Sequence, residues 1–176
     1  MSQKLLRKET ISSTPLAEVW SVWTTKEGVI SFLAPKANIT LEDQGAYEIF
    51  FDPDAPLGFK GTEGCKVLGV NQMKILSVEW RAPPQFPNAR RLKTRVDIYF
   101  ERVEAVTRVR VEHSGWQEGE EWDESYEFFD RAWDLDLARM QQRFSSGPID
   151  WRKPYLPTWN KLRHERIRDH IPVGNH

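Results

Sequence analysis

Few residues in this sequence have the type and setting that catalysis requires. His113 ends a predicted strand on the same face as Val109 and Val111, and an imidazole with an ordinary pKa of about 6.5 could act there as an acid or a base. A structural histidine held by hydrogen bonds is the alternative. The next residues, Ser114-Gly-Trp, do not form the Gly-x-Ser-x-Gly turn of a nucleophilic serine. Acid–base chemistry would need His113 or a carboxylate such as Glu63, and we assign no catalytic residue.

The spacing of the acidic residues and histidines does not match a metal site. Asp52, Asp54 and Glu63 could gather near a cavity mouth, but the segment lacks the glycine and the distant glutamate of a calcium loop. His164 and His170 are six residues apart, which differs from the His-Glu-x-x-His arrangement of zinc enzymes. We therefore expect neither a metal nor another cofactor.

A stripe of large apolar side chains is the strongest pattern near the end of the sequence. Its members follow one another at intervals of 4, 3, 4, 4 and 3 residues: Trp122, Tyr126, Phe129, Trp133, Leu137 and Met140. On a helix this spacing gives an apolar face about 80° wide, so we predict a helix over about residues 120–143. The face could be ordinary core, or it could form the wall of a pocket for a flat or lipid-like ligand.

The elements that would position these residues follow from local patterns. We predict strands at residues 4–11, 38–42, 46–52, 61–70, 74–80, 91–102 and 107–113, and two short helices between the first two strands. The first of these helices is expected to have Thr14 as its N-cap and Pro15 at its first position. Gly28 is expected to separate it from the second, which would contain Val29 and Leu33.

The alternation in the later strands predicts an antiparallel sheet with one wet face, since Val96 and Ile98 alternate with Arg95 and Asp97. The expected fold class is α+β: a curved antiparallel sheet around a long C-terminal helix, with two short helices after the first strand. The residues expected to line a ligand cavity between sheet and helix are Trp80, Val96, Ile98, Val111, His113, Tyr126, Phe129 and Trp133.

The overall composition excludes several classes of protein. The chain has 176 residues, of which 39% are hydrophobic and 29% charged, and its net charge is −1. These values are typical of a globular protein and argue against a nucleic-acid partner. No apolar run approaches the roughly 18 residues of a membrane span, and the first residues lack the features of a signal peptide, so we predict a cytoplasmic protein. The single cysteine, Cys65, excludes an intramolecular disulfide.

The charges are divided between two regions. Residues 118–136 contain nine carboxylates and one arginine, whereas residues 143–176 contain seven Lys or Arg against three Asp or Glu. We therefore divide the chain into a domain at 1–142 and a C-terminal extension at 143–176. Trp151 and Trp159 suggest that the extension packs on the domain or on a partner, and a homodimer formed through it is one expectation.

Several local sequences carry a family resemblance. They are Pro15-Leu-Ala-Glu-Val-Trp20, Phe50-Phe-Asp-Pro-Asp-Ala-Pro56, Gly61-Thr-Glu-Gly-Cys65, His113-Ser-Gly-Trp116, Gly119-Glu-Glu-Trp122 and Tyr126-Glu-Phe-Phe-Asp-Arg-Ala-Trp133. In this order they resemble the START-like SRPBCC superfamily, and within it the family of the activator of the heat-shock-protein-90 ATPase (AHSA-type). The resemblance implies the helix-grip (START/Bet v-like) fold and a hydrophobic ligand cavity. It implies no reaction.

Three functions remain open at this point. The first is binding of a hydrophobic small molecule, such as a lipid, a polyketide or an aromatic metabolite, without established catalysis. The second, implied by the family name, is a chaperone-associated interaction module with a role in the stress response. The third is a cyclase- or hydrolase-like enzyme that uses His113 or Glu63.

Overall fold

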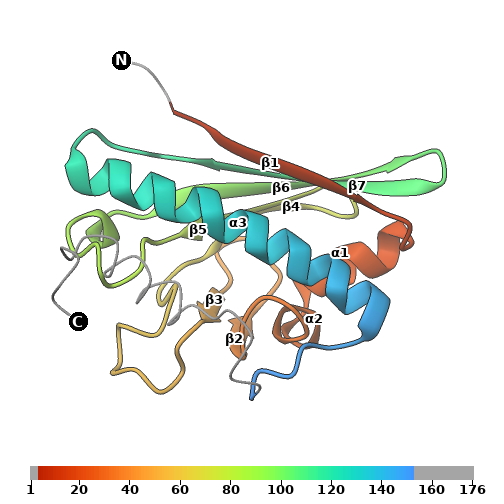
Figure 1. The fold of residues 1–176 in the computed structure, drawn as a ribbon, viewed down its shortest axis with the longest axis horizontal. Helices are drawn as coiled ribbons and strands as arrows, with labels where there is room; N and C mark the ends of the chain where they lie inside the picture. Colours follow the sequence, from red (N-terminus) through yellow and green to blue (C-terminus); the bar gives the residue numbers. More distant parts are fainter. Residues whose placement is uncertain (1–3, 153–176) are drawn as a thin grey trace, which may run out of the picture.

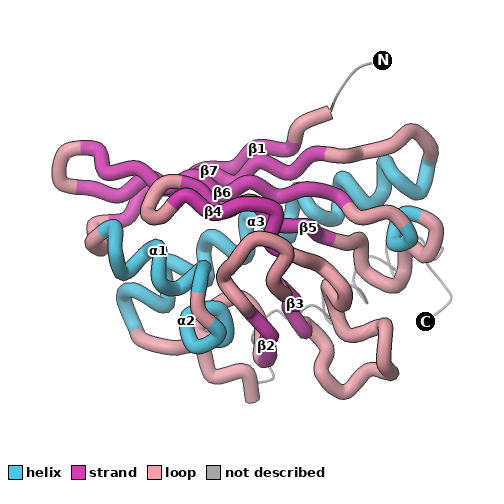
Figure 2. Tube along the Cα trace, turned by 180° about the vertical axis from the view of Figure 1, so that it is seen from behind, coloured by secondary structure: helices cyan, strands magenta, loops and turns pink. Residues whose placement is uncertain are grey.

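The computed structural model describes residues 4–152, in which a long helix lies across one face of an antiparallel sheet (Figure 1). In chain order the elements are β1 (Leu6–Ser12), α1 (Leu16–Thr24), α2 (Lys26–Ile30), β2 (Lys36–Ile39), β3 (Tyr47–Phe50), β4 (Val67–Asn71), β5 (Ile75–Trp80), the 3-10 turn η1 (Ala89–Arg91), β6 (Thr94–Val103), β7 (Val106–Ser114) and α3 (Glu120–Ser146). Five strands form the main sheet in the order β1-β7-β6-β5-β4, and β2 and β3 form a second, smaller sheet. Figure 2 shows this small sheet and the two short helices below one edge of the main sheet. The predicted α+β helix-grip fold is confirmed.

The hairpin of β6 and β7 is the centre of the main sheet. Val96 pairs with His113, and Ile98 pairs with Val111, so that the apolar residues of both strands share the face beneath α3. These four side chains have no exposed surface. The predicted alternation is thus confirmed, because a period of two places every second side chain on the buried face.

The two short helices differ in detail from the prediction. Pro15, not Thr14, occupies the N-cap position of α1, and no side chain caps that helix. Gly28 lies inside α2 and does not separate the helices. The boundary is instead at Thr25, whose Oγ1 accepts a hydrogen bond of 3.0 Å from Gly28 N. The Thr25 side chain caps the N-terminus of α2, so a new helix begins here and α1 does not continue.

Helix α3 extends to Ser146, one turn beyond the predicted end at residue 143. Its stripe is largely as expected: among the six residues only Tyr126 is not buried. Two charged residues, Asp136 and Arg139, were not expected on the inner face but are buried there, with 8% and 5% of their surface exposed. The helix is anchored to α1 by Trp23, whose Nε1 donates to Met140 Sδ at 3.3 Å.

The residues directly after α3 fold back on the domain. Ile149 is buried and its N–H donates to Ser31 O at 2.9 Å, while Trp151 Nε1 donates to Ile30 O at 2.7 Å. The remaining extension, with Trp159, His164 and His170, lies outside the described residues. The division at residue 142 stays a prediction.

The small sheet is joined to the main sheet by residues 61–66. The predicted strand 61–70 was too long, since regular pairing begins at Val67. Before it, Gly61 forms a single bridge with Phe50, and Thr62 N donates to Ile49 O at 2.9 Å. A Cβ atom on Gly61 would lie 1.9 Å from Ile49 O, so that this close approach of two backbones requires glycine.

This contact can be tested with two Gly→Ala substitutions. Gly61→Ala should lower the free energy of unfolding by about 1–3 kcal/mol, because β3 must move to admit the methyl group. Gly69→Ala is the control, since a Cβ atom there meets nothing within 4 Å. Urea denaturation followed by tryptophan fluorescence measures both changes. Equal midpoints for the two variants would contradict this account of Gly61.

Candidate functional site

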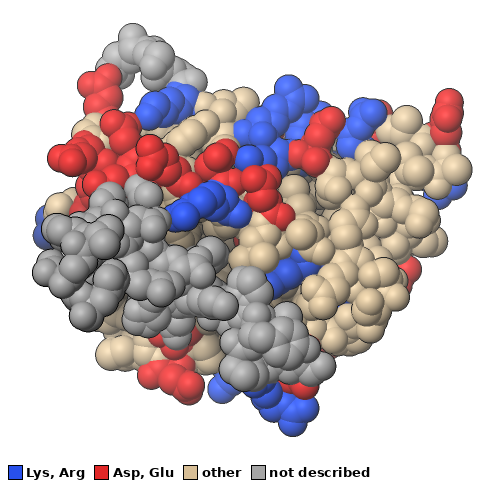
Figure 3. Space-filling model, in the orientation of Figure 1, with Lys and Arg blue, Asp and Glu red and all other residues tan. Residues whose placement is uncertain are grey.

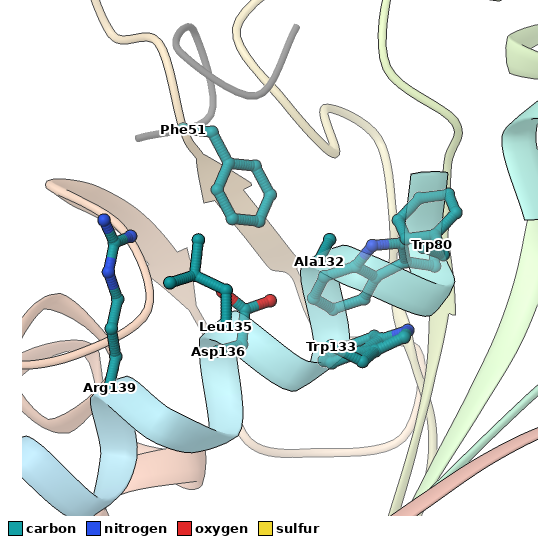
Figure 4. Close-up of a pocket in the computed structure, with 8 residues that line it drawn as sticks. Phe51, Trp80, Ala132, Trp133, Leu135, Asp136 and Arg139 are labelled. Carbon is teal, nitrogen blue, oxygen red and sulfur yellow. The ribbon is translucent and has the colours of Figure 1, made fainter. Parts of the chain in front are cut away.

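A pocket lies between α3, the end of β5 and the segment after β3, and we call it the α3 pocket (Figure 4). It is lined by Phe51, which follows β3, by Trp80 at the end of β5, and by one side of α3: Phe129, Ala132, Trp133, Leu135, Asp136 and Arg139. The walls come from three separate parts of the chain, and most of them are apolar.

Aromatic rings fill most of this pocket. The ring centroids of Trp80 and Trp133 are 5.2 Å apart with planes inclined at 46°, and Phe51 meets Trp80 edge-on at 6.4 Å. Only about 10 Å³ remains for the centre of a water-sized sphere. That space suits roughly one water molecule. In this conformation the side chains leave no room for a larger molecule.

The pocket also contains polar groups that burial makes costly. Burial raises the pKa of Asp136 to about 7, against the opposing attraction of Arg139. Burial lowers the pKa of Arg139, whose guanidinium lies 5.0 Å from the ring centroid of Trp151. Two buried donors, Trp80 Nε1 and Arg139 Nη2, have no hydrogen-bond partner in the structure. Buried unsatisfied donors are rare in folded proteins, and in the described part of the chain Gln85, Ser125 and Arg143 also carry buried polar atoms without a partner. What characterises the pocket is that two such donors lie among aromatic walls.

Sequence reasoning missed Asp136 and Arg139 because the carboxylates of residues 118–136 resemble a solvated surface. A signal was present, however. Asp136 follows Trp133 by three residues and Phe129 by seven, and both intervals place it on the inner stripe of a helix. Arg139 follows Asp136 by three residues and lies about 60° further round the helix, outside the apolar stripe. Helical spacing, applied to polar residues as well as apolar ones, would have found Asp136 but not Arg139.

His113 lies behind the pocket wall, completely buried. Its Nδ1 accepts a hydrogen bond of 3.1 Å from Trp133 Nε1, since an indole nitrogen can only donate. Its Nε2 therefore carries the proton of the neutral ring and donates to Thr94 Oγ1 at 2.7 Å. Burial lowers the pKa of His113 to about 3. Both nitrogens are engaged, which corresponds to the structural alternative for this histidine.

The other residues expected to line a cavity are distributed around the site. Trp80, Phe129 and Trp133 line the α3 pocket. Val96, Ile98 and Val111 are completely buried on the inner face of the sheet. Tyr126 lies toward the end of α3, where its ring centroid is 5.1 Å from that of Trp116 and 5.2 Å from Lys4 Nζ.

Glu63, the other candidate acid or base, organises a loop. Its carboxylate accepts hydrogen bonds from the backbone N–H groups of Lys60 at 2.8 Å and Gly61 at 2.7 Å, and it pairs with Arg90 at 3.2 Å. Burial alone would raise the pKa of Glu63, but these donors and Arg90 together lower it. Glu63 also lines a surface groove of about 470 Å³ beside Phe50, Leu57 and Lys60. The groove is separate from the α3 pocket.

Within residues 4–152 no three His, Cys, Asp or Glu side chains lie close enough to hold a metal ion. Cys65 is buried, and burial raises the pKa of its thiol to about 12. In the same part of the chain, none of the helices combines the length and apolarity needed to cross a bilayer.

The outer face of α3 is acidic, and Figure 3 shows these carboxylates gathered over the first half of the helix. Two N-terminal lysines pair with several of them: Lys4, which precedes β1, with Asp123 at 2.7 Å, and Lys8 of β1 with Asp130 at 2.8 Å and Asp134 at 3.1 Å. The acidic run is thus partly neutralised by the neighbouring strand. The opposite charges of the two regions predict that the basic extension docks on this acidic face, in its own chain or in a partner's. Most of the extension lies outside the described part of the chain, so this stays a prediction.

Comparison with known proteins identifies the family. The family model described as "Activator of Hsp90 ATPase homolog 1-like protein" matches residues 13–145. The chain belongs to this family. No curated protein matches the sequence.

Solved structures show the same fold for members of the AHSA1-like family and for related proteins. A Mesorhizobium loti protein has 20% identity and a TM-score of 0.67, over 83% of this chain and 100% of its own. The Aha1 dimer from Colwellia psychrerythraea has 16% identity and a TM-score of 0.61, over 82% of this chain and 98% of its own. An AHSA1-like protein from Rhizobium etli has 18% identity and a TM-score of 0.61, over 89% of this chain and 90% of its own.

The bonds of His113 predict a loss of stability on substitution. His113→Leu leaves Trp133 Nε1 and Thr94 Oγ1 unpaired, so the free energy of unfolding should fall by about 2–4 kcal/mol. His113→Gln, which keeps a donor and an acceptor, should lose less. Because the folded pKa of about 3 lies below the unfolded value, this residue's contribution is complete above about pH 6.5 and is lost as the pH falls toward 3. Denaturation curves measured between about pH 3 and 6.5 should show that both variants lose this residue's part of the dependence of stability on pH. An unchanged dependence would contradict the buried, neutral state assigned to His113.

The raised pKa of Asp136 predicts the opposite dependence of stability on pH. Its folded pKa of about 7 exceeds the unfolded value of about 3.9, so its contribution is present at low pH and is lost as the pH rises through 7. Asp136→Asn should therefore become progressively more stable than the wild type between about pH 4 and 8, by a few kcal/mol at most. The quantity to measure is the difference between variant and wild type, since His113 opposes the trend in both. A difference that does not change with pH would refute it.

Proposed function

We propose that this protein binds an apolar, ring-containing small molecule in the α3 pocket, and that its function is binding without catalysis. The observation that carries the proposal is the meeting of four aromatic side chains, Phe51, Trp80, Phe129 and Trp133, around polar groups that lack partners. Ligand sites are typically apolar with a few polar groups that orient the ligand. The position between sheet and long helix is also where the helix-grip fold is expected to hold a hydrophobic ligand.

The candidate acids and bases support binding over chemistry. His113 has both ring nitrogens in hydrogen bonds, and Glu63 accepts two backbone hydrogen bonds and pairs with Arg90. A general base must reach the proton that it removes, and neither side chain lines the α3 pocket. We therefore assign neither of them a role in turnover.

Binding requires the pocket to widen, because the present space suits roughly one water molecule. Phe51 is the wall best placed to move. It lies just after the end of β3 and begins an irregular segment, residues 51–60, whereas Trp80 and Trp133 belong to regular elements of the core. We propose that an entering ring displaces Phe51 and stacks on Trp80 and Trp133.

The predicted protein partners rest on the family alone. A chaperone partner is an expectation from the family name. The Colwellia psychrerythraea Aha1 protein is a dimer. A homodimer of the present chain through its C-terminal extension stays a prediction.

Substitutions in the wall test the proposal. Binding of 2-methylnaphthalene, followed by quenching of tryptophan fluorescence, should tighten about tenfold in Phe51→Ala, because the ring no longer has to be displaced. Ala132→Leu should weaken binding by filling the pocket. Ala138→Leu, the same substitution at an exposed position of α3, is the control and should leave binding unchanged. Thermal melting of each variant verifies that it is folded. The proposal fails if neither the wild type nor Phe51→Ala binds the probe.

A further inference from the structure

We infer that the ligand of the α3 pocket is an elongated aromatic acid: an anionic oxygen at one end binds Arg139, and a neutral oxygen at the other end accepts a hydrogen bond from Trp80. The inference rests on the proposed function and goes beyond it by stating the chemical class of the ligand. It follows from which polar residues line the pocket, which of their buried atoms lack partners, and where these residues lie in the fold.

Trp80 supplies a fixed donor. Its side chain is 1% exposed, and its Nε1 has no partner in the structure. An indole nitrogen can only donate, so its complement is an acceptor such as a carbonyl, ether or hydroxyl oxygen. The ring is held between Phe51 and Trp133, which sets the direction of the N–H group. Leaving such a donor buried and unpaired costs free energy, which a ligand oxygen would recover.

Arg139 supplies the charged end. It is 5% exposed, its Nη2 is unpaired, and no carboxylate of the described residues lies within ion-pair distance of it. Among the described residues, the ring centroid of Trp151 lies 5.0 Å from the guanidinium and Asp136 attracts it electrostatically, while Nη2 stays without a hydrogen bond. Guanidinium groups bind carboxylates through paired, charge-assisted hydrogen bonds, so a carboxylate or an ionised phenol is the matching ligand group.

The two donors belong to residues at different ends of the pocket, which favours an elongated ligand. Figure 4 shows Trp80 and Arg139 toward opposite ends of the pocket, with Asp136 and Leu135 between them and Phe51 above. One small polar group cannot serve both donors, whereas a fused ring system with an oxygen at each end can. The apolar walls between the ends match its aromatic body.

Asp136 limits the affinity for an anion. Its carboxyl group faces the same pocket, so its ionised form repels an anionic ligand and its neutral form does not. Burial favours the neutral form, with a pKa of about 7. Replacement by the isosteric amide should therefore tighten binding of an anion, which is a change opposite in sign to that expected from removing Arg139.

Three probes separate the two ends: 6-methoxy-2-naphthoate has both oxygens, 2-naphthoate has only the anionic end, and 2-methoxynaphthalene has only the neutral end. At about pH 8, where the carboxylates are ionised, the wild type should bind 6-methoxy-2-naphthoate most tightly. Arg139→Met should weaken binding of both carboxylates by about tenfold to a hundredfold and leave 2-methoxynaphthalene within about twofold. Arg143→Met, one turn further along α3 and outside the pocket, is the control.

Two further variants complete the test. Trp80→Phe keeps an aromatic wall but removes the donor, and should weaken both methoxy probes by about threefold to tenfold relative to 2-naphthoate. Asp136→Asn should tighten both carboxylates. Each comparison is between probes in one folded variant, so a general loss of packing cannot imitate the pattern.

The outcomes distinguish this inference from the proposed function. If all three probes bind the wild type alike, or if Arg139→Met weakens them all equally, the ligand is not selected by an anionic end and the inference is overturned while hydrophobic binding stands. If none of the probes binds the wild type or Phe51→Ala, the proposed function fails and the inference fails with it.

Discussion

The hydrogen bond from Trp133 Nε1 to His113 Nδ1 is the contact on which the arrangement of helix and sheet depends. It joins the middle of α3 to the end of β7 inside the core, where water cannot compete for either atom. Because His113 also bonds to Thr94 of β6, the helix is tied to two neighbouring strands at once. An indole in place of a leucine therefore provides both packing and a directed bond, which defines the rotation of α3 against the sheet.

The orientation of Trp133 in turn determines the candidate site. One side of its ring system belongs to the buried cluster around His113, and another packs on Trp80 and forms a wall of the α3 pocket. The same helix rotation turns Asp136 and Arg139 inward, although both would be cheaper to hydrate at the surface. A fold that keeps such groups buried with unpaired donors is poorly explained by stability alone. The proposed binding of a polar ligand group would account for them.

Much of the fold could be predicted from local patterns. The alternation of Val96 and Ile98 with charged residues identified a central strand, and the spacing of Trp122, Phe129 and Trp133 identified the long helix. Errors occurred where backbone contacts between distant segments override local preference. Gly61 was assigned to a strand, but its close approach to Ile49 makes residues 61–66 a turn against β3. Thr25, whose side chain begins α2, gave a local signal that went unused beside Gly28.

The amino-acid sequence by itself determined the element types, the inner face of the helix and the family, because periodicity and local motifs are properties of neighbouring residues. It also brought Phe129, Trp133 and Trp80 into the candidate set. Only the tertiary structure decided that both nitrogens of His113 are hydrogen-bonded, that Phe51 lines the pocket, and that Asp136 and Arg139 are buried. The physical reason is that hydrogen bonding and burial depend on atoms from distant segments. The sequence of a helix alone does not show whether a charged side chain will be solvated or will pack against an aromatic ring.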